Sequence, residues 1–108
     1  MKPSPILKGT LDLLLLRTLE LEPLHGVAIA DRIRRLTRGA FDVKAGSLFP
    51  ALHRMEQEGW IVGEWGQSPE GRRIKSYRLT AAGKKRLSSE RANWLRTATA
   101  MTRVLEAT

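Results

Sequence analysis

The sequence GSLFPALHRMEQEGWIV at residues 46–62 decides the fold, because a helical pattern of apolar residues in it gives way to an extended one. Leu48, Leu52 and Met55 recur at the four- and three-residue spacing of one helical face. Gly59 suits the left-handed position that follows the end of a helix. We therefore expect a helix from about residue 46 or 47 to 59, followed directly by a strand.

The opposite side of this helix is short, polar and basic. The predicted DNA contacts on it and just before it are Lys44, Ser47, Phe49, Pro50, His53 and Arg54. Arginine can donate two hydrogen bonds to guanine and serine can reach a phosphate, so such a face suits the major groove. Pro50 is tolerable there because the amides of a first helical turn have no partner within the helix. A solvated helix face is the alternative interpretation.

A hairpin is expected after this helix, with strands over residues 60–65 and 73–79 and a loose tip of glycine, serine and proline between them. Arg72, Arg73 and Lys75 concentrate positive charge beside the tip. A slender basic hairpin can follow a phosphate backbone or enter a narrow minor groove. A solvated loop is again the alternative.

Two more helices are expected upstream, over residues 11–22 with Thr10 as the cap and over 27–37, joined by a tight turn at Leu24, His25 and Gly26. Leucines lie nearly all round the first of them, which is typical of a helix buried between other elements. The order helix, helix, helix, hairpin is that of a winged helix-turn-helix. The predicted class is therefore mainly α with a small β-hairpin (α+β), with a flexible arm at residues 1–5 and a DNA-binding domain at 6–79.

A long helix is expected from Ala81 to about Ala107, capped by Thr80, within a C-terminal dimerisation segment at 80–108. Its length of ~40 Å exceeds the body of so small a domain. An apolar seam of the kind through which helices pair runs along it, formed by Leu87, Trp94, Ala98, Met101 and Leu105. We expect a homodimer; the alternative is that the seam folds back on its own domain.

Composition favours a polyanionic partner, since the 108 residues carry a formal net charge of +8. The absence of cysteine excludes disulfides and thiolate metal sites, and the isolated His25 and His53 offer no metal site. We find no phosphate loop and no nucleophile motif, and we expect no enzyme activity and no cofactor. The longest apolar run, Leu13–Leu16, is too short to span a membrane, so we expect a cytoplasmic protein without a membrane partner.

Four blocks of sequence carry a resemblance to a known family: KGTLDLLLLRTL at 8–19, LHGVAIA at 24–30, GSLFPALHRMEQEGWI at 46–61 and RRIKSYRLTAAGKKRL at 72–87. In order and spacing they resemble the PadR family of bacterial transcriptional regulators. The resemblance implies a two-fold dimer through the last helices and DNA contacts from the basic wing. Phe49 and Val27 stand where the family commonly has tyrosine, which puts a tyrosine hydroxyl contact out of reach here.

The function expected from these features is a DNA-binding regulator, a repressor acting on an inverted-repeat operator as a homodimer. The resemblance also implies release from DNA by a small molecule. The dimer cleft beside Trp94 is the candidate site for a small apolar or aromatic effector. The alternatives are a winged helix that binds RNA and one that binds protein. RNA binding requires exposed aromatic side chains for stacking, and we expect Trp60 and Trp65 to lie beside the core hairpin, with Phe49 as the one candidate.

Overall fold

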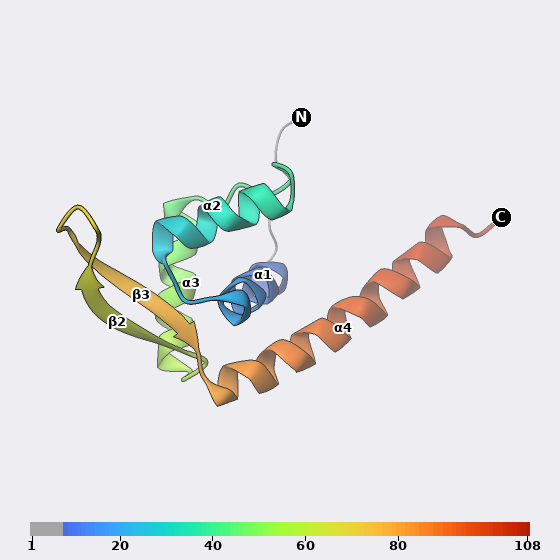
Figure 1. The fold of residues 1–108 in the computed structure, drawn as a ribbon. Helices are drawn as coiled ribbons and strands as arrows, with labels where there is room; N and C mark the ends of the chain where they lie inside the picture. The colour runs from blue at the N-terminus through green and yellow to red at the C-terminus, as the bar shows by residue number, and fades with distance from the viewer. Residues whose placement is uncertain (1–7) are drawn as a thin grey trace.

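The structure is a computed structural model that describes residues 8–108, so the predicted arm at residues 1–5 lies outside the described part. In chain order the elements are α1 (Lys8–Leu21), β1 (Leu24–His25), α2 (Gly26–Leu36), α3 (Ala45–Gln57), β2 (Ile61–Gln67), β3 (Arg73–Leu79) and α4 (Ala81–Leu105). Three helices pack beside an antiparallel sheet, and α4 projects away from them (Figure 1). The predicted winged helix-turn-helix is confirmed.

Helix α1 is the central element, as its leucine pattern predicts. It contacts α2, α4 and β3, and Leu15 and Leu16 retain no exposed surface. The helix is already formed at Lys8, so Thr10 lies inside its first turns and is not the residue that caps it. Asp12 is buried on the same helix with 4% of its surface exposed.

The sheet has three strands in the order β1-β3-β2, where the sequence predicts only the hairpin. Residues 24 and 25, expected as a turn, pair with β3 in the register Leu24↔Tyr77 and His25↔Ser76. A two-residue strand is too short to show an alternating pattern, which explains why it was missed. His25 also caps α2, because its Nδ1 accepts a hydrogen bond from the Ala28 N–H at 3.4 Å.

The wing is joined to α3 and α4 at Gly59 and Thr80, through hydrogen bonds of the Thr80 hydroxyl. Gly59 follows α3 with a φ of 79°, in the left-handed region predicted for it. The Thr80 hydroxyl donates to the Gly59 carbonyl at 2.6 Å and accepts from the Gly83 N–H at 3.0 Å. Thr80 is thus the cap of α4, as predicted, and it fixes the start of that helix against the end of α3.

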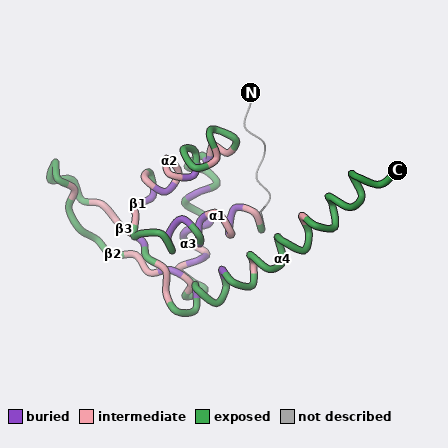
Figure 2. The backbone as a smooth tube through the Cα atoms, turned by 45° about the vertical axis from the view of Figure 1, so that its right-hand side comes forward, coloured by how far each residue is buried: buried purple, intermediate pink, exposed green. Residues whose placement is uncertain are grey.

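Helix α4 belongs to the body of the domain at its start and leaves it further along. Leu87, predicted to lie on the dimer seam, is 1% exposed within the chain's own core, so it is not available to a partner. All residues from 99 to 108 are exposed, and Figure 2 shows this end of α4 as an exposed tube that extends beyond the body. The helix gives the chain a longest dimension of 59 Å against 33 and 21 Å.

Candidate nucleic-acid interface

Helix α3 presents the face that the sequence predicts for DNA. Leu48, Leu52 and Met55 are almost completely buried against the core, with at most 2% exposed. The exposed side carries Lys44, Ser47, Phe49, Pro50 and His53. These five predicted contact residues are therefore all accessible on α3 and just before it.

Pro50 lies further into α3 than expected. The helix begins at Ala45, with Lys44 at the cap position, so Pro50 is in the second turn and not in the first. Proline has no N–H for the carbonyl four residues earlier, which belongs to Gly46. Both residues are exposed, so water or a ligand can satisfy that carbonyl on the outward side of the helix.

Arg54 does not share the outward face with its predicted neighbours. Its guanidinium donates to both carboxylate oxygens of Asp12, with Nη2 at 2.5 Å from Oδ1 and Nη1 at 3.1 Å from Oδ2. This hydrogen bonding raises the pKa of Arg54, and burial opposes the increase. The predicted base contact is replaced by an ion pair between α3 and α1. The sequence signal was Asp12 itself, because a carboxylate in a helix that is apolar all round requires a buried partner.

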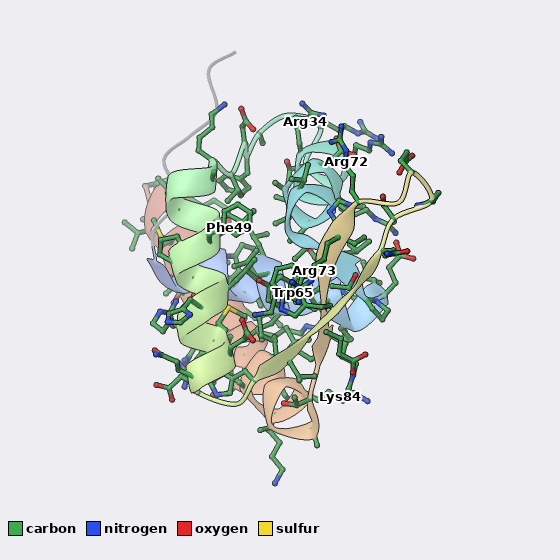
Figure 3. All side chains as sticks on the ribbon, turned by 90° about the vertical axis from the view of Figure 1, so that its left-hand side faces the viewer. Arg34, Phe49, Trp65, Arg72, Arg73 and Lys84 are labelled. Carbon is green, nitrogen blue, oxygen red and sulfur yellow. The ribbon has the colours of Figure 1, made fainter. Side chains whose placement is uncertain are left out.

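The wing carries two of its three predicted cations toward solvent. Arg72 and Arg73 are exposed, and Figure 3 shows both on the wing, in front of the body of the domain. Lys75 is turned inward, and its Nζ donates to Oε1 of Glu56 on α3 at 3.0 Å. In the sequence Glu56 is one acid of a charged helix end, and no local pattern marks it as the partner of Lys75.

Trp65 is an exposed aromatic residue on the wing, contrary to the expectation that it lies beside the core hairpin. Its side chain is 58% exposed, and the guanidinium of Arg73 lies 4.4 Å from the centre of its ring. Figure 3 shows Trp65 and Arg73 between the wing and α3, with Phe49 on the α3 side. A cavity of about 370 Å³ lies here, lined in part by Phe49, Trp65 and Tyr77. Phe49 is thus not the only aromatic residue on this surface.

Trp60 follows the expectation more closely. It is half-buried and packs against the core, while the guanidinium of Arg86 lies 4.7 Å from its ring centre. Of these two tryptophans, Trp65 is therefore the one that is exposed on the wing.

Further basic side chains lie on α2 and on the connector to α3. Arg34 and Arg35 are 57% and 75% exposed and pair with Asp31 on the same helix. Lys44 is 78% exposed and donates to Asp42 at 2.5 Å, which lowers the pKa of that carboxyl group. Exposed ion pairs of this kind are weak, so these cations can exchange a carboxylate for a phosphate at little cost.

A second apolar surface lies away from the α3 and wing face, between α1 and α4. A groove of about 430 Å³ is lined by Leu13, Leu14, Phe41, Trp94 and Leu95, with Thr10, Arg17 and Arg91 completing it. Trp94 is 49% exposed and Leu95 is 54% exposed. An open apolar groove therefore borders Trp94 within the single chain, while the predicted cleft in the dimer stays a prediction.

Within residues 8–108 no three acidic or histidine side chains come together as they would around a metal ion. No helix in the same part of the chain is long and apolar enough to cross a membrane.

An exposed recognition helix beside a basic hairpin defines the class: a winged-helix DNA-binding protein.

Comparison with known proteins gives the family. Residues 15–89 match the PadR-like family of transcriptional regulators. An uncharacterized protein from Lysinibacillus sphaericus is 31% identical over 91 residues, which are 84% of each chain. A transcriptional regulator from Mycobacterium tuberculosis is 38% identical over 58 residues, 54% of this chain and 53% of that one.

Solved structures agree with this assignment. A PadR family transcription regulator from Clostridium difficile is 33% identical with a TM-score of 0.76, over 87% of this chain and 96% of that one. A PadR-like transcriptional regulator from Bacillus cereus is 28% identical with a TM-score of 0.82, over 97% of this chain and all of the other. The chain belongs to the PadR-like family of transcriptional regulators.

Proposed function

We propose that this regulator is a cytoplasmic homodimeric repressor without enzyme activity, which binds an inverted-repeat operator and is released by a small apolar or aromatic effector. The observation that carries the proposal is the surface shared by α3 and the wing. Ser47, Pro50 and His53 are exposed there for the major groove, and Arg72 and Arg73 are exposed for the phosphate backbone.

The dimer is supported by apolar side chains on α4 that no other part of residues 8–108 covers. Met101, Val104 and Leu105 are 59%, 75% and 81% exposed, on the part of α4 that projects beyond the body. Together with Trp94 and Ala98 they form the seam that is left for a partner, because Leu87 is buried in the chain's own core. Apolar surface of this kind is a common mark of a protein interface.

A two-fold dimer places two copies of α3 against equivalent stretches of major groove, which requires a DNA site with a dyad. Half-site centres are then about one helical turn, ~10 bp, or a small multiple of it apart. With Lys75 paired to Glu56, the free wing cations are Arg72 and Arg73 and their two-fold mates. About four phosphate contacts correspond to a roughly hundredfold loss of affinity between about 50 and 200 mM salt.

The effector is assigned to the groove between α1 and α4. Its volume of about 430 Å³ and its apolar lining suit a small, flat organic molecule against Trp94. Because the groove also borders the proposed dimer helices, a ligand there can change how far apart the two copies of α3 are held.

Selection of DNA tests the proposal. Random genomic duplex fragments retained by the purified protein are sequenced and then footprinted, while sedimentation at micromolar concentration gives the oligomeric state. The expected result is a dimer that protects a site with a dyad and binds it more weakly as salt rises. A monomer at these concentrations, or a protected site without a dyad, would contradict the proposal.

RNA binding is retained as the second candidate because Trp65 is 58% exposed, which supplies a stacking surface on the wing. A single-stranded RNA of random sequence is therefore included as a competitor in the same assay. If duplex DNA displaces the selected duplex and RNA does not, the result supports operator binding. Efficient displacement by RNA supports the second candidate.

A further inference from the structure

The wing and helix α3 are joined by a side-chain ion pair that reaches across 19 residues of sequence. Lys75 on β3 donates from Nζ to Oε1 of Glu56, in the last turns of α3, at 3.0 Å. The two side chains are 28% and 25% exposed, so the pair lies in the crevice between the elements and not on the open surface. It connects the two parts of the DNA-facing surface directly.

Gly63 on β2 leaves the space through which Lys75 reaches Glu56. A Cβ atom at this position would lie 2.3 Å from Cε of Lys75 and 3.2 Å from Oε2 of Glu56. Gly63 has no positive φ, so the backbone itself does not require glycine there. The Lys75 side chain therefore occupies space that a side chain at position 63 would take, and Cε1 of Tyr77 would also lie 3.2 Å from that Cβ atom.

The aromatic neighbours of Lys75 complete its surroundings. Its Nζ lies 5.4 Å from the ring centre of Tyr77 and 5.9 Å from that of Trp65. The hydrogen bond to Glu56 raises the pKa of Lys75, and burial opposes the increase. The charge of this lysine is therefore already satisfied before any phosphate approaches.

We infer that Glu56 determines specificity: by holding Lys75 in the crevice, it fixes the angle between wing and α3 and withholds one cation from the DNA backbone. A free lysine at this place would strengthen binding to every sequence alike, because phosphate contacts carry no base information. A wing held at one angle places Arg72 and Arg73 on the backbone only when α3 is seated in its own site. The inference rests on the proposed recognition of an operator.

Three variants test this inference. Glu56→Gln removes the acceptor charge and so weakens the hold on Lys75; Gly63→Ala keeps both charges but crowds the lysine. Gly66→Ala is the matched control, since a Cβ atom on Gly66, in the same strand, meets nothing within 4 Å. Each protein is titrated with a duplex selected by the wild-type chain and with a shuffled duplex of equal composition, over a range of salt.

Glu56→Gln should bind the shuffled duplex more tightly, and the slope of log affinity against log salt should steepen by about 1.8 for two freed lysines per dimer. The ratio of selected to shuffled affinity should fall in Glu56→Gln and in Gly63→Ala, and it should stay at the wild-type value in Gly66→Ala. An unchanged ratio in Glu56→Gln, or equal weakening on both duplexes with the wild-type slope, would overturn the inference.

Amide hydrogen exchange in the free protein separates this inference from operator recognition. Glu56→Gln should increase exchange in residues 64–73 of the wing relative to α1, whether or not any DNA is present. If the wild-type chain selects no duplex, the proposed function fails by itself. If the wing exchanges equally in both proteins, the positioning role of Glu56 fails even where DNA is bound.

Discussion

Replacement of Arg54 by alanine distinguishes a base-reading arginine from a structural one. In the structure Arg54 neutralises Asp12, whose residue surface is only 4% exposed, so Arg54→Ala leaves a buried carboxylate without its cation. Breaking one side of a buried pair costs about 3 to 5 kcal/mol of unfolding free energy. The side chain of Arg54 is 30% exposed, so we expect a value near the lower end, about 3 kcal/mol.

The assay is urea unfolding at one fixed protein concentration, because association adds its own stabilisation. Arg78→Ala is the matched control: Arg78 pairs with Glu64, both side chains are more than half exposed, and its loss should cost less than about 1 kcal/mol. Asp12→Leu combined with Arg54→Met should recover most of the loss, since an apolar pair can replace a buried ion pair. The structural role of Arg54 is refuted if Arg54→Ala is as stable as Arg78→Ala and loses sequence preference.

Three further predictions concern single positions. Gly83→Ala should destabilise the fold by well over about 1 kcal/mol, because its Cβ would lie 2.0 Å from the Trp60 carbonyl oxygen; thermal unfolding beside Gly66→Ala measures this. The phenolate absorbance of Tyr77, the single tyrosine, should titrate above the ordinary pKa of about 10 because burial raises it, and stability should fall as the pH rises through that range. Met101→Ser should weaken association in sedimentation without changing the fold, whereas Leu87→Ala should lower folding stability directly; equal effects of the two on association would contradict the division of α4.

Local sequence rules predict the elements of this fold because their signals are close together in the chain. The spacing of Leu48, Leu52 and Met55 locates the buried face of α3, and Gly59 and Thr80 mark the ends of the neighbouring helices. Each of these residues acts through its own backbone geometry or through neighbours within a helical turn. Such signals survive in a single sequence without knowledge of the tertiary contacts.

The candidate site was predicted less completely because its side chains are directed by partners far away in sequence. Arg54 has an outward position by helical angle, but Asp12, 42 residues earlier, draws its guanidinium inward. Lys75 is likewise drawn inward by Glu56, 19 residues earlier in the sequence. Trp65 follows a different rule: the hairpin continues past the core, so an aromatic residue in its outer half has no apolar surface to cover it.

The distribution of charge in the structure changes what the net charge of +8 means for DNA binding. In the described residues ten ion pairs occupy ten different lysine and arginine side chains, among them Arg54 and Lys75. Pairs in crevices or in the core hold their cations, whereas exposed pairs release them readily to a phosphate. Arg72 and Arg73 on the wing are exposed and belong to none of these ten pairs. The salt dependence of binding accordingly counts the unpaired cations and the cations of exposed pairs that reach the duplex, and not the total charge of the chain.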